Sequence, residues 1–407
     1  MTSYAARLMR PHPIGDAGPR RRGSVRRGWV RRVAPPDPVL AAVSVLLFVA
    51  GCLAVYAATR NHLLAQGRDP RFYIKRDLVN GGIGLVLAVL ATRCDLRLVT
   101  GLLPVLYTGG ILALLAVLTP LGVTINGAHA WFKLGPLELE PSEFFKVLLV
   151  LLTAVLLGDV RRAEVARTRP QAGSVLRCLA LVAAPMLLVL AEPALGVAIV
   201  LVVVLVLQVT ISGAPRVWIV GLVGGGLLAA VLAVQLHALK PYQQARFTAF
   251  LAPTSDTTGV GYHLEQSQVA IGSGGLLGRG YLDGDQTNSG FVPEQQTDFI
   301  FTVVGEESGL AGGAVLLVLY AVLLNRGFRL AARAADGFDA LVAAGVTTWF
   351  AVQCFINIAM TIGLAPVTGL PLPFLSYGGS ALFATAVGVG LLQNVARRTH
   401  RAVARSG

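Results

Sequence analysis

Ten long apolar segments, separated by polar ones, limit what this chain of 407 residues can fold into. As a helix rising 1.5 Å per residue, each segment is long enough to cross most of the ~30 Å hydrocarbon core of a bilayer. We predict spans at residues 38–58, 77–92, 98–120, 142–158, 176–191, 194–212, 217–238, 298–324, 339–362 and 374–395. The expected fold class is an all-α polytopic membrane protein with about ten transmembrane helices.

The composition agrees with this fold class. Hydrophobic residues make up 55% of the chain and charged residues only 14%, whereas soluble domains carry about 25% charged residues. The first apolar segment is too long and lies too far from the start for a cleaved signal peptide, so we expect a retained anchor. The fifth and sixth spans are the hardest to separate, because only Glu192 and Pro193 interrupt them.

The positive charge is distributed asymmetrically over the loops. The net charge of +13 could indicate nucleic-acid binding, but 24 of the 34 lysines and arginines fall in the two ends and in alternate loops. Cytoplasmic loops of membrane proteins carry such an excess. We therefore expect a multi-pass protein of the cytoplasmic membrane with both termini inside, membrane lipids as neighbours, and no nucleic-acid partner.

Three regions follow from this topology. Residues 1–37 are rich in Arg, Pro and Gly and are expected to be a disordered cytoplasmic tail. Residues 38–396 form the ten-helix membrane domain, and residues 397–407 form a short basic cytoplasmic tail. One long loop, 239–297, lies between the seventh and eighth helices on the extracellular side. Loops of this length usually carry function, so an active site on that face is favoured.

Several common kinds of site are missing from the sequence. The four cysteines are scattered, with no CxxC or Cys/His spacing that would indicate a disulfide framework or a zinc site. The histidines show no metal-ligand pattern. Neither a Ser/His/Asp set nor a Walker loop is found, which argues against a hydrolase and against an ATP-driven pump.

Asp298 lies where the long polar loop meets the eighth apolar segment. One interpretation is structural: Thr297 or Asp298 caps the N–H groups of the helix that begins there. The other is a general base at the edge of the membrane, and the two are compatible because a capping carboxylate can still accept a proton. Glu306 and Glu307 follow about two turns deeper, where ionisable groups are costly and usually functional.

A second polar group precedes the fourth span. Glu143 and Lys146 are three residues apart and share one helix face, and Lys146 lies inside the apolar run. The pair could be an ion pair that only fixes packing. Alternatively, Lys146 could bind an anionic lipid headgroup, with Glu306 or Glu307 completing the cluster.

The third feature is the stretch 369–380, in which two prolines and three glycines interrupt helical geometry. Irregular backbone at membrane depth is tolerated only where protein buries it or where it lines a cavity. Ser376 lies in this stretch. Arg246, in the long loop, is either a headgroup anchor or a phosphate clamp. Lys133 follows Trp131, which we expect to be an interfacial anchor in the loop before the fourth span.

Three separated motifs resemble one known family. They are Phe132-Lys133-Leu134-Gly135 with Glu140-Pro141-Ser142-Glu143 and Lys146, then Pro293-Glu294 with Thr297-Asp298-Phe299-Ile300-Phe301 and Gly305-Glu306-Glu307, and finally Pro366 to Ser380. Together with Gly261-Tyr262 and Gln266-Ser267, these motifs resemble the SEDS proteins (shape, elongation, division and sporulation) of bacteria. The resemblance covers nearly everything after the N-terminal tail. The run Val367 to Pro373 is more similar to the elongation member RodA than to the division member FtsW.

The resemblance implies a peptidoglycan glycosyltransferase that polymerises lipid II outside the membrane for cell elongation, together with a class B penicillin-binding protein. It places Asp298 at the family's essential aspartate. Substrate contacts are expected from the set Arg246, Lys146, Glu143, Lys133, Glu306 and Ser376. One departure stands out: the family's usual Pro-Asp-Leu-Gly element has Ala194 in place of the aspartate, and the preceding Glu192 is the candidate to replace it.

The implied chemistry needs one base and a means of stabilising charge. Lipid II already carries a pyrophosphate leaving group, so Asp298 would take the proton of the attacking GlcNAc 4-hydroxyl in a single inverting displacement. Arg246, Lys146 or a divalent cation such as Mg²⁺ or Mn²⁺ would stabilise the departing undecaprenyl pyrophosphate. A lipid II flippase and a non-catalytic scaffold for division or sporulation are the alternatives, and neither of these needs a base.

Overall fold

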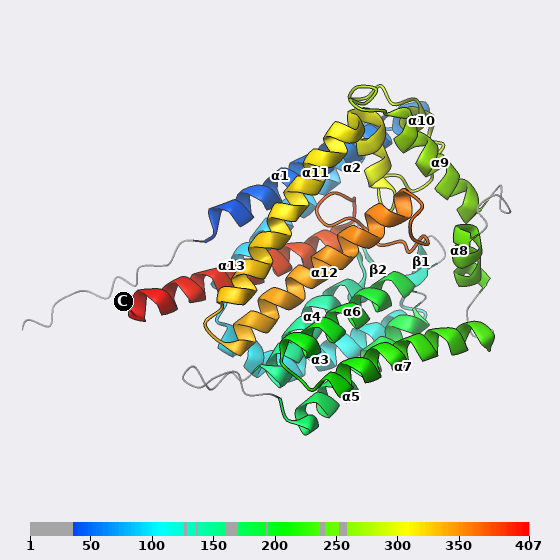
Figure 1. The fold of residues 1–407 in the computed structure, drawn as a ribbon. Helices are drawn as coiled ribbons and strands as arrows, with labels where there is room; N and C mark the ends of the chain where they lie inside the picture. Colours follow the sequence, from blue (N-terminus) through cyan, green and yellow to red (C-terminus); the bar gives the residue numbers. More distant parts are fainter. Residues whose placement is uncertain are drawn as a thin grey trace, which may run out of the picture. The chain divides into compact units, whose positions relative to one another are not determined.

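The computed structural model describes residues 36–125, 128–135, 137–158, 170–192, 194–236, 241–251 and 259–406. The predicted disordered tail, 1–37, lies almost entirely outside these residues. The helices are α1 (Pro38–Ala65), α2 (Phe72–Arg93), α3 (Leu96–Val117), α4 (Pro141–Leu157), α5 (Ala172–Ala191), α6 (Leu195–Ile211), α7 (Arg216–Gln235), α8 (Pro241–Leu251), α9 (Val260–Ser273), α10 (Asp285–Ser289), α11 (Ile300–Arg333), α12 (Gly337–Thr361) and α13 (Gly379–Ser406) (Figure 1).

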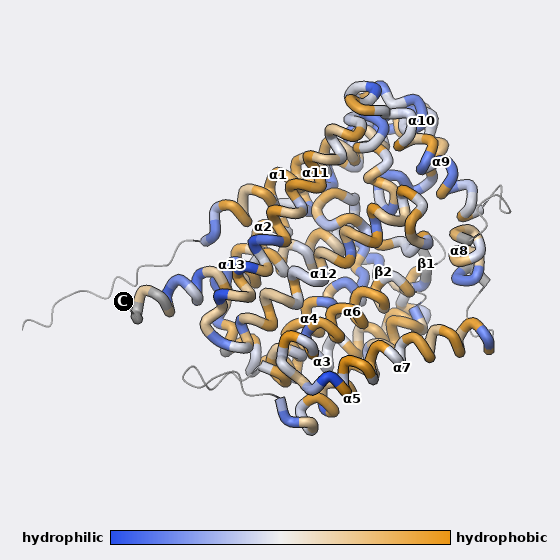
Figure 2. Tube along the Cα trace, in the orientation of Figure 1, coloured by the Kyte–Doolittle hydropathy of each residue, from blue (hydrophilic) through white to orange (hydrophobic). Residues whose placement is uncertain are grey.

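Each of the ten predicted spans corresponds to one long helix. Among the described residues, seven helices are long and apolar enough to cross a membrane: α1, α3, α5, α7, α11, α12 and α13. The helices α2, α4 and α6 account for the other predicted spans. Apolar residues dominate most of these helices, whereas the segments around α9 and α10 are more polar (Figure 2). The fold class of a helical multi-pass membrane protein is thus confirmed.

Close helix packing depends on small residues. The helix α13 packs along α2, and α12 contacts α4, α6, α11 and α13. A Cβ atom at Gly390 of α13 would lie 2.5 Å from the carbonyl oxygen of Ala88 in α2, so the two backbones approach as only glycine permits. By contrast, α7 has no fully buried residue, and most of its apolar side chains are exposed, as expected for a helix facing lipid.

The structure also contains a small antiparallel sheet that was not predicted. Its strands β1 (Val123–Ile125), β2 (Ala128–Leu134) and β3 (Leu137–Leu139) lie in that order between α3 and α4. The residues around Trp131, expected in a loop, are therefore in β2. Gly135 has a φ of 63° at the turn between β2 and β3, a left-handed conformation that glycine adopts without strain.

The long loop predicted at 239–297 contains α8, α9 and α10. The loop is joined to α11 where that helix breaks at Gly309, whose φ is 62°. The N–H groups of Leu310 and Ala311 donate to the carbonyls of Gly275 and Leu276. In the opposite direction, the carbonyls of Glu306 and Glu307 accept from two N–H groups at 279 and 280. The loop thus supplies the hydrogen bonds that the broken helix lacks.

Side-chain contacts fasten the ends of α1, α11, α12 and α13 opposite the loop. The backbone N–H of Asp37, which caps α1, donates to Gln393 at 2.7 Å, and the Asp37 carboxylate lies 3.7 Å from Arg326. Arg398 contacts Asp336 at 3.2 Å and Asp339 at 2.9 Å. The segment predicted as a separate basic tail from 397 onward instead continues α13 to Ser406.

The contact between α2 and α13 predicts a glycine requirement. We expect Gly390→Val to lower the unfolding free energy of the detergent-solubilised protein by about 1–3 kcal/mol, because the side chain has no space against α2. Gly82→Val is the matched control, since a Cβ atom at Gly82 meets nothing within 4 Å. Thermal unfolding measures both variants, and equal losses of stability would contradict the close packing.

Candidate functional site

The centre of the site is the irregular segment 362–378 between α12 and α13. Its residues Leu370, Leu372 and Leu375 belong to the hydrophobic core, where free carbonyl groups would be costly. Side chains from neighbouring helices supply the donors: Gln353 to the carbonyl of Pro371 at 2.6 Å, Asn357 to that of Leu370 at 2.8 Å, and Tyr320 to that of Pro373 at 2.6 Å. The predicted broken segment is confirmed, and its shape is fixed by these bonds.

Asp298 is attached to the same segment through its backbone. The side-chain amide of Asn357 that binds Leu370 also donates to the carbonyl of Asp298 at 2.8 Å. The N–H of Tyr377 donates to the carbonyl of Gln296 at 2.9 Å. The helix-capping interpretation was wrong, because α11 begins after Phe299 without any side-chain cap hydrogen bond. The carboxylate of Asp298 is therefore not used to cap the helix.

Asp298 and Arg246 converge on Gly369. A Cβ atom at Gly369 would lie 3.4 Å from the Oδ2 atom of Asp298 and 3.6 Å from the Nη2 atom of Arg246. Gly369 has a φ of 73°, a conformation that favours glycine. The close neighbours are a second reason for glycine at this position. Arg246 also donates to the carbonyl of Thr368 at 2.9 Å. Three parts of the chain thus meet at one point: α8, the residues just before α11, and the irregular segment.

Burial raises the pKa of Asp298 to about 6, with the nearby charge of Arg246 lowering it and that of Glu294 raising it. The side chain remains partly exposed. A carboxylate with this pKa is mostly ionised at neutral pH yet is a stronger base than an ordinary aspartate. Such a group can accept a proton from a bound hydroxyl.

Glu143 and Lys146 form a buried pair on α4, next to this centre. The Lys146 Nζ atom lies 2.7 Å from Glu143 and 3.0 Å from the Oε1 atom of Gln353. It also lies 5.0 Å from the ring centroid of Trp349, and the lysine side chain is only 1% exposed. Since Gln353 in turn binds Pro371, the pair supports the irregular segment. Direct contact of Lys146 with a substrate stays a prediction that its buried position does not favour.

Two glutamates near this centre, Glu140 and Glu192, were not in the predicted set of catalytic and substrate-binding residues, although Glu192 was the candidate to replace the family's aspartate. Burial raises the pKa of Glu140, at the start of α4, to about 7, and the charge of Glu143 raises it further. Glu192, at the end of α5, is 0% exposed, and neither carboxylate oxygen has a hydrogen-bond partner within the described residues. Its pKa is raised to about 8 by burial and by Glu140. In the sequence, the feature that could have identified both glutamates is their position at the ends of apolar segments.

Of the remaining predicted residues, Lys133 and Glu306 do not join the centre, whereas Ser376 lies within the irregular segment itself. Lys133 is exposed in β2, opposite Glu138 of β3. The Glu306 carboxylate accepts hydrogen bonds from the backbone of Gln286 and from Thr287 in α10. Ser376 accepts from the N–H of Leu372 at 2.8 Å, which braces the irregular segment. The contacts of Glu306 and Ser376 are structural ones that the sequence pattern does not reveal.

The described part of the chain contains no group of three or more His, Cys, Asp or Glu side chains that could hold a metal ion. A site made only of protein ligands is therefore not found there. Mg²⁺ is often bound by one or two carboxylates together with substrate phosphates, and the carboxylates around Asp298 fit only that kind of site.

Comparison with known proteins places these features in one family. The sequence profile of the FtsW/RodA/SpoVE family of cell cycle proteins matches residues 38–401. The chain is 36% identical over 373 residues to the peptidoglycan glycosyltransferase MrdB of Escherichia coli K12, covering 90% of this chain and 94% of that protein. It is 34% identical to the stage V sporulation protein E of Bacillus subtilis, covering 89% and 97%.

Solved structures agree with the fold. The rod shape determining protein RodA of Thermus thermophilus superposes with a TM-score of 0.64 at 30% identity, covering 91% of this chain and 98% of that one. A chain of a peptidoglycan synthase complex that coordinates polymerization and crosslinking gives a TM-score of 0.73 at 32% identity, covering 90% and 99%. This membrane protein belongs to the FtsW/RodA/SpoVE family.

Proposed function

We propose that this protein is a peptidoglycan glycosyltransferase that polymerises lipid II into glycan strands for cell elongation. The observation that carries the proposal is the meeting of Asp298 and Arg246 at Gly369. A carboxylate beside a cation at the edge of a membrane domain is the pair of groups that this reaction needs. Relatives named as peptidoglycan glycosyltransferases cover nearly the whole chain, which supports the same reaction.

The charge distribution supports an extracytoplasmic site. Most basic residues fall in the chain ends and in alternate loops, which favours cytoplasmic termini. With ten spans, the loop containing α8, α9 and α10 then lies outside the cell. Asp298 and Arg246 belong to that side and would meet lipid II in the outer leaflet.

The reaction follows from the two side chains. The Asp298 carboxylate accepts the proton of the acceptor 4-hydroxyl while that oxygen forms a bond to the anomeric carbon of the donor. The bond from this carbon to the pyrophosphate oxygen breaks, and undecaprenyl pyrophosphate leaves with the electron pair. The guanidinium of Arg246 offsets the charge of the pyrophosphate. One displacement without a covalent intermediate inverts the anomeric configuration.

Two further parts of the proposal concern partners. A class B penicillin-binding protein is the expected partner, supported by the likeness to a chain of a peptidoglycan synthase complex. A divalent cation, if required, would have to share its ligands between these carboxylates and the substrate phosphates. Polymerisation with and without a chelator tests the requirement.

A lipid II flippase or a non-catalytic scaffold is the competing function. Either one could use the same helical bundle, but neither gives a reason for a carboxylate with a raised pKa beside an arginine. The assay of purified protein with labelled lipid II distinguishes them, because only the enzyme makes polymer.

Asp298→Asn is expected to lower the polymerisation rate by about 10²- to 10⁴-fold, because the base is lost while the shape is kept. Glu265→Gln removes an exposed carboxylate from α9 in the same loop region and should keep normal activity. Gel analysis of the labelled polymer measures both. Normal polymer from the Asp298→Asn protein, with unfolding temperatures unchanged, would rule out the assigned role.

The pH dependence of polymerisation reports on the same carboxylate. Since the pKa of Asp298 is raised to about 6 and the base must be ionised, the rate should fall as pH decreases through that value. Arg246 lowers this pKa, so Arg246→Gln should move the acid limb to higher pH as well as slow the reaction. If the acid limb of the pH–rate profile stays at the same pH in the Arg246→Gln protein, a group other than Asp298 is titrating.

The pair on α4 predicts a loss of stability. Lys146→Met leaves Glu143 buried without its cation and should cost about 3–5 kcal/mol of unfolding free energy. Adding Glu143→Gln to it should recover part of this loss, because the uncompensated charge disappears. Thermal unfolding of the single and double variants measures the coupling. Additive losses would mean that the two side chains do not stabilise each other.

A further inference from the structure

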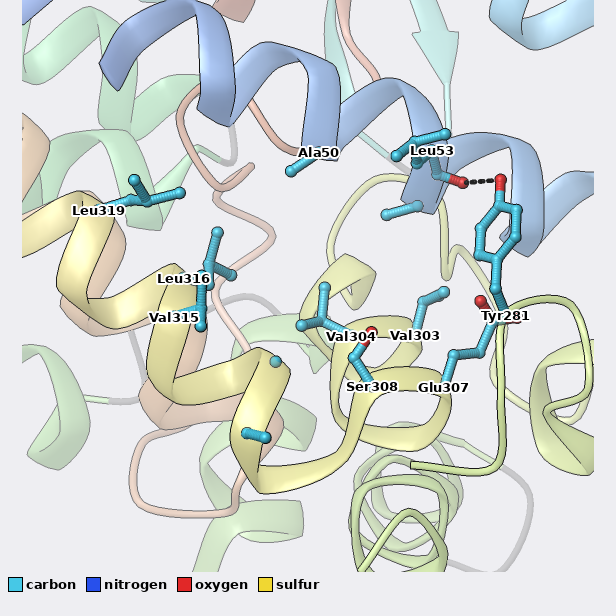
Figure 3. Close-up of a pocket in the computed structure, with 13 residues that line it drawn as sticks. Ala50, Leu53, Tyr281, Val303, Val304, Glu307, Ser308, Val315, Leu316 and Leu319 are labelled. Atoms are coloured by element: carbon cyan, nitrogen blue, oxygen red, sulfur yellow. Dashed lines mark hydrogen bonds between the residues drawn. The ribbon is translucent and has the colours of Figure 1, made fainter. Parts of the chain in front are cut away.

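A groove of about 390 Å³ lies between α1 and α11, apart from the site at Asp298. Figure 3 shows Ala50 of α1 on one side of it and Val315 and Leu316 of α11 on the other, whereas Leu53 lies toward Tyr281. Tyr281 lies at one end of the groove, beside Glu307 and Ser308. The groove therefore has a polar end toward the loop and an apolar remainder.

The break in α11 accompanies this groove. Gly309 departs from helical geometry between Ser308 and Ala311, both of which line the space. The loop residues that bind the broken helix lead directly to Tyr281. The Tyr281 hydroxyl donates to the carbonyl of Leu53 at 3.2 Å, which joins the loop to α1. Its proton is therefore already used within the protein.

Glu307 is the polar side chain of the groove whose hydrogen bonding is incomplete. Its side chain lines the groove and the residue is only 5% exposed. Its Oε1 atom has no hydrogen-bond partner within the described part of the chain. A buried carboxylate oxygen without a donor is costly. A ligand that brings an N–H donor with positive charge would satisfy it.

The dimensions favour a lipid chain over a helix. After the break at Gly309, the groove follows α11 from Ala311 to Leu319, about 12 Å along a helix, which fits within the ~15 Å depth of one leaflet's hydrocarbon. A transmembrane helix with side chains is about 10–12 Å across and would need a trough along the whole bilayer. The volume of about 390 Å³ is instead within the range of small-molecule sites.

We propose that this groove binds one acyl chain of an aminophospholipid, whose primary ammonium group donates to Glu307. The chain lies along the apolar surface from Val315 to Leu319. Arg60 lies seven residues beyond Leu53 on α1, about two helical turns along the same face, and its positive charge would attract the lipid phosphate. The pairing of an acidic and a basic side chain matches a zwitterionic headgroup. This proposal does not depend on the enzymatic function.

The test compares two lipids that differ in N–H donors. Detergent-washed full-length protein is incubated with phosphatidylethanolamine or with phosphatidylcholine of identical chains, and retained lipid is counted by native mass spectrometry. The quaternary ammonium of phosphatidylcholine has no N–H group. We expect about tenfold tighter retention of phosphatidylethanolamine, the size of one charge-assisted hydrogen bond. Glu307→Gln should reduce this preference to about twofold or less, because the acceptor becomes neutral. Equal retention of the two lipids by the unaltered protein would overturn the proposal.

A matched pair of variants tests the place of binding. Ala311→Phe fills the groove and should abolish retention, whereas Ala314→Phe, exposed on the same helix but outside the groove, should retain lipid normally. Unfolding temperatures verify folding, and Ala50→Phe fills the groove from α1 if Ala311→Phe does not fold. Equal retention by the filled and control variants would contradict this site. Unchanged lipid retention with loss of a co-expressed partner's transmembrane helix would identify a helix-docking surface instead.

Discussion

The supply of hydrogen-bond donors to one irregular segment is the constraint on which the site depends. The segment between α12 and α13 abandons helical geometry inside the hydrophobic core, where water does not replace the missing bonds. Gln353, Asn357 and Tyr320 donate to three of its carbonyls at 2.6–2.8 Å. Each donor comes from a helix that also packs in the core, so the segment keeps one shape. A broken segment without these donors would carry several unsatisfied carbonyl groups, each costing on the order of 1–3 kcal/mol.

The same bonds give the candidate base its position. Asn357 binds the irregular segment and Asp298 at once, so the carboxylate is held relative to Gly369 by the scaffold. Lys146 fixes Gln353 and is itself neutralised by Glu143. A buried cation thus supports the geometry of the site from behind, while Arg246 supplies positive charge at its open side. Because Lys146 is buried behind the site and Arg246 lies at its open side, the site holds charged groups next to the hydrophobic core while Asp298 stays accessible.

Much of the helical fold was predictable because segment length and apolarity are physically required in a bilayer. Asp298 was singled out because it lies where the polar loop meets an apolar segment, and Arg246 because it lies in the same long loop; their proximity at Gly369 comes from the structure. The sequence could not reveal which carboxylates are already satisfied. Glu306 is bound by α10, whereas Glu192, which was only a candidate replacement for a lost aspartate, is buried without a hydrogen-bond partner in the described residues. The sheet at 123–139 was missed because its strands are short and lack clear alternation. Helix capping by Thr297 or Asp298 was wrong because capping depends on the exact residue at which a helix begins.

If Asp298 is the base, the acceptor sugar binds with its 4-hydroxyl at this side chain. An experimental structure of the Asp298→Asn protein with bound lipid II tests this most directly, since the substrate would remain uncleaved. We expect the acceptor 4-hydroxyl within about 2.6–3.2 Å of the residue 298 side chain, with the donor pyrophosphate at Arg246. Both sugars bound at another face of the bundle, or residue 298 sealed from the lipid, would contradict it.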